Sequence, residues 1–341
     1  MGPPIRSAEK ARVSSCQVAD EVAEAVIAKF KSIHCEPVSS QIVLAGIVAI
    51  LDSSAVRVVS LAIGNKFEAS GTKRTDCVRD CHAEILARRA FKRFLLDQFD
   101  LLSSGNDSAL FTLARDNRII QTPNVQWALY VSSCPCGNAC IRRWGDSPKE
   151  KFDDTVKEFQ LPQNAVHAPF LAHARHEGQT AVSFKGESSI LSCSDKILKW
   201  SINGLQGAGL SGMTESAIYL DAIVIGRKFV RKHAERAFCC RLTSKKISKN
   251  VATKVHHPTM LCTARKLDDG PIDAVTGAVF TDSVMWWCLG RDVEYIDGSS
   301  GKRVDGSRSL LGPEFLRCSI PPPLEAVAVN KLLETEMFNS L

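Results

Sequence analysis

The stretch that most constrains the fold is Cys81-His82-Ala83-Glu84, because it opens a long run of apolar residues at helical spacing. We expect Asp80 to cap this helix, which places His82 and Glu84 in its first turn. Two residues apart, their side chains diverge by about 200° on an ideal helix. They can converge only on a group at the helix end, such as a metal ion with a bound hydroxide. The apolar positions of the run are Ile85, Leu86, Phe91, Phe94, Leu95 and Phe99.

Length and composition predict an ordinary globular protein. The chain has 341 residues, of which 45% are hydrophobic and 23% charged, so wholesale disorder is excluded. We expect a disordered start at 1–14 and a single domain over 15–341, with an irregular insertion at about 145–190. The longest apolar run, Ile42–Leu51, is too short to span a bilayer. The start of the chain does not resemble a signal peptide, so the thirteen cysteines are expected as free or metal-bound thiols in the cytoplasm and/or nucleus.

Strand and helix patterns alternate along the chain and predict an α/β protein with a central mixed sheet covered by helices on both faces. Helices are expected at Cys16–Ile33, from the His82 region to about Leu102, at Asp195–Asn203 with Ser194 as cap, and at Leu324–Phe338. Strands are expected at Ile42–Leu51, Ala55–Ile63, Val125–Ser132 and Ala217–Ile225.

His82 and Glu84 form the His-x-Glu half of the zinc nucleobase-deaminase signature, which also needs two thiolates. Cys136 follows a predicted strand and opens a predicted helix, so it is the first candidate. The simple signature places the second cysteine three residues later, where this chain has Ala139. Cys140, on the same helical face, and Cys134 are alternatives. Cys193 also stands at a helix start, where the N-terminal field is expected to lower its pKa toward the thiolate.

Three blocks carry a family resemblance: Cys81–Arg89, Ser133–Gly137, and Ser192–Trp200 continued by Gly204–Ala208. In this order they resemble the adenosine deaminases acting on RNA. Their span, 80–211, with weaker matches at Val43–Gly46 and His233–Ala237, covers about half the chain. The resemblance implies a cytidine-deaminase-like three-layer fold and zinc-dependent hydrolysis of adenosine to inosine. It assigns His82, Cys136 and Cys193 as zinc ligands, and Glu84 as the proton carrier, leaving Cys140 as a core thiol.

The resemblance also implies a buried inositol hexakisphosphate and a relay from Asp80 through Lys196 to Gln206. Two departures put part of the phosphate cage in doubt, namely Arg79 where the family has asparagine, and a short C-terminal region. We therefore expect part of the cage to be either missing or rebuilt, in the second case from Arg303, Arg308 and Lys331. The matching cage positions are Ile85, Arg88, Arg89, Lys196, Lys199 and Lys302.

Positive charge is concentrated in one segment, Gly226–His257. The segment carries ten basic residues and one acid, a net +9, so the rest of the chain is −3 within the total of +6. Such a block is typical of a polyanion-binding surface, although a solvated basic face has the same composition. The predicted RNA-contacting residues are Lys228, Arg231, Lys232, Arg236, Lys245 and Lys246.

Ala208 resembles the transfer-RNA branch of the family, and no double-stranded-RNA-binding domain is expected in 1–40. We therefore expect the substrate to be the adenosine at position 37, just 3′ of the anticodon of tRNA(Ala), within an anticodon stem-loop. No membrane and no obligate protein partner are expected. The alternatives are the catalytic domain of a double-stranded-RNA adenosine deaminase that edits messenger RNA, and a non-catalytic RNA-binding subunit.

Overall fold

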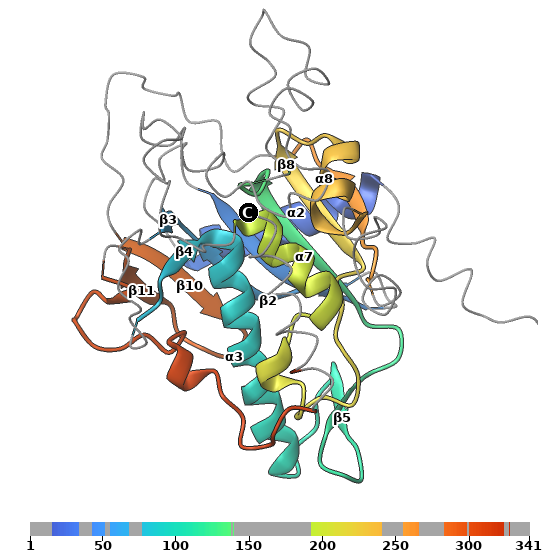
Figure 1. The fold of residues 1–341 in the computed structure, drawn as a ribbon, viewed down its shortest axis with the longest axis vertical. Helices are drawn as coiled ribbons and strands as arrows, with labels where there is room; N and C mark the ends of the chain where they lie inside the picture. The colour runs from blue at the N-terminus through green and yellow to red at the C-terminus, as the bar shows by residue number, and fades with distance from the viewer. Residues whose placement is uncertain are drawn as a thin grey trace, which may run out of the picture.

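The computed structural model describes residues 16–33, 43–51, 55–67, 77–137, 139, 192–240, 255–265, 283–298, 300–323 and 327 (Figure 1). The predicted disordered start and the predicted insertion at about 145–190 lie outside these ranges. Nearly all of the predicted closing helix Leu324–Phe338 lies outside them as well. All three therefore stay predictions.

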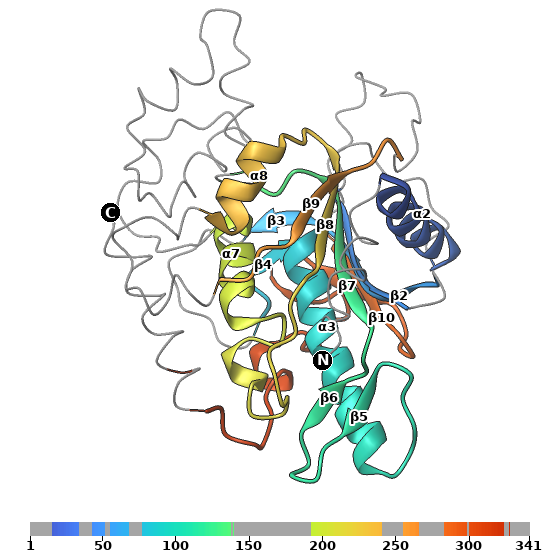
Figure 2. The same ribbon diagram turned by 90° about the vertical axis from the view of Figure 1, so that its right-hand side faces the viewer.

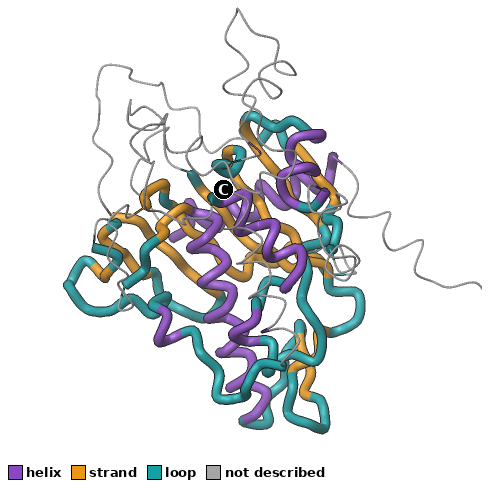
Figure 3. The backbone as a smooth tube through the Cα atoms, in the orientation of Figure 1, coloured by secondary structure: helices purple, strands orange, loops and turns teal. Residues whose placement is uncertain are grey.

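The described helices are α2 (Cys16–Ile33), α3 (Ala83–Ser103), α7 (Cys193–Asn203) and α8 (Arg231–Phe238), with 3-10 turns at Ala208–Leu210 and Pro313–Phe315. The longer strands run side by side across the middle of the molecule (Figure 3). The strands are β1 (Leu44–Ile50), β2 (Val56–Ile63), β3 (Asn65–Phe67), β4 (Asp80–His82), β5 (Phe111–Leu113), β6 (Ile119–Gln121), β7 (Gln126–Ser133), β8 (Ala222–Arg227), β9 (Thr259–Cys262), β10 (Ser283–Cys288), β11 (Glu294–Asp297) and β12 (Lys302–Arg303).

Eight strands form one mixed sheet in the order β12-β11-β10-β2-β1-β7-β8-β9. The pairs from β12 to β7 are antiparallel, whereas β7–β8 and β8–β9 are parallel. Parallel neighbours need a crossover connection, and α7 lies in the one between β7 and β8. The mixed α/β architecture predicted from the sequence is confirmed. The crossover brings the start of α7 to the end of β7, where the candidate site forms.

The two faces of the sheet bury separate cores, because successive side chains of a strand point to opposite faces. On β1, Leu44 and Val48 belong to the core under α2, whereas Ala45 and Ile47 belong to the core under α3. Figure 2 shows α2 on one side of the sheet and α3, α7 and α8 on the other. The helices α3, α7 and α8 therefore share one face of the sheet.

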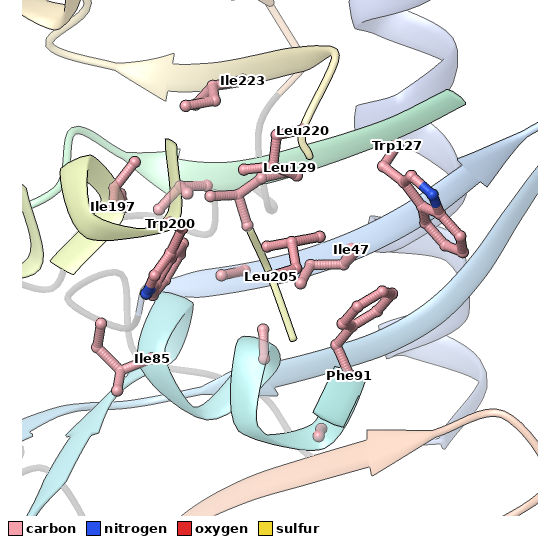
Figure 4. Packing of buried hydrophobic residues seen from close by; sticks show 14 of the residues in the cluster. Ile47, Ile85, Phe91, Trp127, Leu129, Ile197, Trp200, Leu205, Leu220 and Ile223 are labelled. Carbon is pink, nitrogen blue, oxygen red and sulfur yellow. The ribbon is translucent and has the colours of Figure 1, made fainter. Parts of the chain in front are cut away.

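Aromatic packing anchors α3 on that face (Figure 4). The ring of Phe91 meets Trp127 of β7 edge-on, with centroids 5.1 Å apart, and Trp127 stacks on Phe111 at 5.9 Å. Fully burying such a side chain contributes about 1.5–3 kcal/mol. Trp200 of α7 lies beside the first turn of α3 at the other end of the cluster (Figure 4). This packing sets the position of both helix N-termini.

The structure corrects several predicted boundaries. Asp80 does not cap α3, because Asp80–His82 form β4 and His82 itself is the N-cap. Ser194 does not cap α7 either: Ser192 does, and its N–H donates to the Asp195 carboxylate (2.9 Å) while the Asp195 N–H donates to its hydroxyl (3.3 Å). This reciprocal arrangement is a capping box. The strand expected from Ala217 begins only at Ala222.

None of the helices within the described ranges combines the length and the apolarity that crossing a bilayer needs.

Candidate active site

The site lies where β4 passes into α3. β4 pairs with β3, with His82 opposite Asn65, and the Ala83 N–H donates to the Gly64 carbonyl at 3.0 Å. This pairing keeps the chain extended through His82 and delays the start of the helix. Glu84 is then the second residue of α3 and is 3% exposed. Free backbone N–H groups and the helix dipole favour negative charge at this position.

Asp80 holds the His82 ring. One carboxylate oxygen lies 2.7 Å from Nδ1 of His82 and accepts the His82 backbone N–H at 3.0 Å. The other oxygen forms an ion pair with the Lys196 ammonium group of α7. A ring that donates from Nδ1 keeps the lone pair of Nε2 for a metal ion. The predicted contact between Asp80 and Lys196 is therefore present, and it ties α7 to the start of α3.

Burial and pairing shift the pKa values of both Asp80 and His82. Burial alone would raise the pKa of Asp80, but Lys196 and His82 hold that pKa well below its usual range. Burial lowers the pKa of His82, but Asp80, Cys136 and Glu84 together outweigh burial and raise it to about 10. A metal ion binding to His82 must therefore displace a proton.

Cys136 and Cys193 come from the two segments that the crossover brings together. The backbone N–H and the hydroxyl of Ser194 both donate to the Cys136 carbonyl, at 2.9 and 2.7 Å. Gly137 continues the chain at a φ of 95°, and a Cβ there would lie 2.1 Å from the Ser192 hydroxyl oxygen. Only glycine therefore allows the loop after β7 to approach the start of α7 this closely.

The ligand atoms of His82, Cys136 and Cys193 all lie within 4.8 Å of one another. Tetrahedral zinc, with Zn–S near 2.3 Å and Zn–N near 2.0 Å, needs its ligand atoms roughly 3.3–3.8 Å apart. The spacing in the structure approaches this requirement. Of the alternatives, Cys134 donates its thiol to the Ala139 carbonyl at 3.4 Å, outside the group, and Cys140 lies outside the described residues. The three predicted ligands are the ones brought together.

Hydrogen bonding links the Cys136 and Cys193 members of the cluster. The Cys193 backbone N–H donates to the Cys136 sulfur at 3.4 Å, and hydrogen bonding from the Cys193 thiol lowers the pKa of Cys136. Burial and the adjacent Cys136 raise the pKa of Cys193 well above its usual value. The predicted lowering of the Cys193 pKa is therefore wrong for this arrangement, in which the Cys193 backbone N–H donates to Cys136 instead.

Glu84 sits beside this cluster with an environment suited to proton transfer. Burial raises the pKa of its carboxyl group, although the His82 charge and hydrogen bonding from Cys193 lower it in part. A carboxyl group whose pKa is raised toward neutrality can both take up and release a proton during a reaction.

A second charged feature follows along α3, where Arg88, Arg89 and Lys92 are partly buried cations. Arg88 Nε donates to the Leu205 carbonyl at 2.9 Å, and Arg89 Nε donates to the Leu311 carbonyl at 2.7 Å. Burial and the Arg89 charge lower the pKa of Arg88 to about 9, and burial with both guanidinium groups lowers that of Lys92 well below its usual value. Partly buried charges of the same sign are costly unless they are paired, so this cluster is suited to binding a polyanion.

Sequence reasoning missed Lys92, although it follows Arg88 by four positions and so shares its helix face. The other predicted cage residues are more scattered. Ile85 is buried in the core and offers no charge, Lys199 is partly exposed on α7, and Lys302 follows Gly301, whose carbonyl accepts the Val78 N–H at 2.9 Å.

Gln206 holds the turn that follows α7. Its side-chain oxygen accepts the Ile218 N–H at 3.0 Å, and its side-chain nitrogen donates to the Asn203 carbonyl at 2.8 Å. The relay step from Lys196 to Gln206 stays a prediction.

The basic block is described only in its first part. Lys228, Arg231 and Lys232 are exposed, and Arg236 is partly buried. The helix α8 that carries the last three packs on α7 and β9, on the same face of the sheet as the site (Figure 2). Lys245 and Lys246 lie outside the described residues.

The fold and site define an α/β protein with a His–Cys–Cys ligand cluster beside a buried glutamate. Residues 60–315 match the family model described as the adenosine-deaminase (editase) domain. The chain belongs to the adenosine-deaminase (editase) domain family, as the resemblance of its sequence blocks predicted.

Curated relatives come from two groups. The double-stranded RNA-specific editase B2 of Mus musculus is 29% identical over 343 residues, covering 90% of this chain and 43% of the relative. The double-stranded RNA-specific adenosine deaminase of the same species is 28% identical over 285 residues, covering 77% and 23%. The tRNA-specific adenosine deaminase 1 of Drosophila melanogaster is 30% identical over 225 residues, covering 60% and 54%. The chain spans less than half the length of the first two.

Proposed function

We propose that the chain hydrolytically deaminates adenosine to inosine in RNA at a zinc site formed by His82, Cys136 and Cys193. The observation that carries this proposal is the convergence of the three ligand atoms within 4.8 Å beside the buried Glu84. One imidazole and two thiolates leave the fourth position of tetrahedral zinc for water. When bound, zinc supplies a water molecule activated at neutral pH.

The chain's own residues then do the remaining work. Asp80 fixes the tautomer and the direction of His82, and Lys196 keeps Asp80 ionised. Glu84 takes one proton from the attacking water and delivers it to N1 of the adenine, and then transfers the second proton of that water, from the new hydroxyl on C6, to the amino group, which leaves as ammonia. Ammonia and inosine are the products. We propose in addition that the fold is the cytidine-deaminase-like three-layer fold, with this site at its centre.

For the substrate we favour the adenosine at position 37 of tRNA(Ala). An anticodon loop presents an unpaired base, which lowers the cost of moving it into a buried site. Ala208 and the match to a tRNA-specific relative support this choice. A double-stranded-RNA substrate is the second candidate, supported by the editase B2 match over 90% of the chain.

Activity of Glu84→Gln on both RNAs tests the proposal. The amide keeps the size of the side chain but cannot carry the proton, so we expect unchanged zinc content and a rate of inosine formation lower by about 10²–10⁴-fold. The wild-type chain should convert the anticodon-loop adenosine of tRNA(Ala) faster than adenosines of a long RNA hairpin. An active Glu84→Gln protein would refute the role of Glu84, and preference for the hairpin would favour the second candidate.

We also propose that Arg88, Arg89 and Lys92 bind a polyphosphate, for which inositol hexakisphosphate is the expected compound. The support is the lowered pKa of Arg88 and Lys92, which a bound polyanion would reverse. Denaturing the purified chain should release about one inositol phosphate per chain, measured by anion-exchange chromatography. A folded, active preparation that releases none would contradict this proposal.

A further inference from the structure

A second cluster of metal-ligating side chains lies away from the candidate active site, at the end of α8. The sulfur atoms of Cys239 and Cys240 are 3.3 Å apart, and the Cys240 sulfur lies 3.8 Å from Nδ1 of His257. All three ligand atoms lie within 4.8 Å of one another. Tetrahedral zinc places its sulfur and nitrogen ligands roughly 3.3–3.8 Å apart. The geometry of this cluster therefore meets the requirement as closely as that of the active site.

We propose that Cys239, Cys240 and His257 form a second metal site that takes a zinc ion. Two thiolates and an imidazole are donors that zinc favours, whereas magnesium and calcium prefer oxygen ligands. Two thiolates also neutralise the charge of the ion, so it can bind beside the basic residues of α8. Cys240 and His257 are exposed, which gives the ion a path from solvent and leaves its fourth position open to water.

The two segments that carry the ligands are both held by one residue of α7. The hydroxyl of Ser201 donates to the Phe238 carbonyl at 2.9 Å, and the His256 N–H donates to the Ser201 carbonyl at 2.7 Å. The end of α8 and the segment entering β9 are thus brought together independently of any ion. This fixes the backbone on which Cys239 and His257 are presented.

The adjacent histidines have opposite roles in this arrangement. His256 turns inward, with Nε2 2.9 Å from the Leu220 carbonyl and its ring stacked on Tyr219 at 4.7 Å. Because successive residues of an extended segment point to opposite sides, His257 is directed toward Cys240. Cys239 caps the C-terminus of α8, where the helix dipole favours a cation.

The site would tie together residues that are 17 positions apart. In the sequence, Lys245 and Lys246 lie between Cys240 and His257, so the ion would close the stretch that carries these predicted RNA-binding residues. A cross-link of this kind stabilises the folded chain, because it removes conformational freedom from the unfolded one.

Zinc content of the full chain, purified without chelator and measured by plasma mass spectrometry, tests the proposal. We expect about two zinc ions per chain, and about one after either Cys240→Ser or His257→Gln. Both residues are exposed, so these variants should fold. Cys262→Ser is the matched control, an exposed cysteine on β9 outside the cluster, and it should leave zinc content unchanged. Cys193→Ser should remove the other ion.

The two zinc proposals fail in distinguishable ways. If zinc content falls with Cys193→Ser but not with Cys240→Ser or His257→Gln, the second site is refuted and the active site stands. If it falls only with Cys240→Ser and His257→Gln, the second site stands alone. Peptide mapping that finds Cys239 and Cys240 joined in a disulfide in the freshly purified protein would also overturn the second site.

Discussion

At the scale of single residues, the site depends on a few groups that permit close approach or hold a ligand. Asp80 both directs the His82 ring and pairs with Lys196, so one carboxylate links two helix starts. Ser194 fixes the Cys136 carbonyl, and Gly137 leaves the space in which these segments meet. The identity of the candidate ligands follows from the family resemblance of the sequence blocks, but the need for glycine at 137 appears only from its contact with the Ser192 hydroxyl.

Gly137→Ala should therefore destroy the site. An added Cβ would lie 2.1 Å from the Ser192 hydroxyl oxygen, so the loop after β7 and the start of α7 must separate. We expect loss of the zinc ion proposed at Cys136 and Cys193, together with a lower midpoint in urea unfolding. Metal analysis and a denaturation curve measure both effects.

Gly105→Ala is the matched control, because Gly105 has a similar positive φ of 79° with nothing within 4 Å of an added Cβ. That variant should lose only about 1–2 kcal/mol of folding stability, which is the cost of a non-glycine residue in the left-handed region, and it should keep its zinc. If Gly137→Ala retains zinc and resembles the Gly105 variant in stability, the steric argument is wrong.

At the scale of elements, the decisive feature is the crossover between the parallel strands β7 and β8. It places α7 beside α3 and delivers Cys193 to Cys136, two ligands 57 positions apart. Periodicity predicted α2 with its observed ends and α3 to within a residue at its C-terminus. It failed at the start of α3, because the pairing of β4 with β3 is a non-local contact that no local pattern encodes. The cap of α7 was readable, since Ser192 and Asp195 have capping-box spacing.

The helix α8 carries the described part of the basic block, and its exposed charges should bind RNA phosphates. Replacing Arg231 and Lys232 with alanine should weaken RNA binding and reduce the slope of log affinity against log salt by about 0.7–0.9 for each phosphate that is no longer neutralised. Filter binding at several salt concentrations measures this slope.

Arg57→Ala with Lys31→Ala is the control for that measurement. Both residues are exposed, Arg57 on β2 and Lys31 on α2, and the double variant removes the same charge away from α8. An equal reduction of affinity and slope in this control would show that net charge, and not the position of α8, governs binding.

At the scale of the whole molecule, the candidate active site and the Cys239, Cys240 and His257 cluster lie on the same face of one mixed sheet. α3, α7 and α8 cover that face, whereas α2 covers the other (Figure 2). The sequence was sufficient for the family and for the candidate ligands, through the resemblance of its blocks, and for the mixed α/β class, through its alternating strand and helix patterns. It was not sufficient for the Cys239, Cys240 and His257 cluster, because the two segments that carry these residues are brought together by tertiary packing around α7.

The central claim is that His82, Cys136 and Cys193 bind one metal ion beside Glu84. X-ray diffraction from crystals of the full chain, recorded on both sides of the zinc absorption edge, tests it most directly. We predict an anomalous peak about 2.0–2.3 Å from Nε2 of His82 and from the sulfur atoms of Cys136 and Cys193. Zinc-containing crystals of active protein that show no peak among these three atoms would contradict the claim.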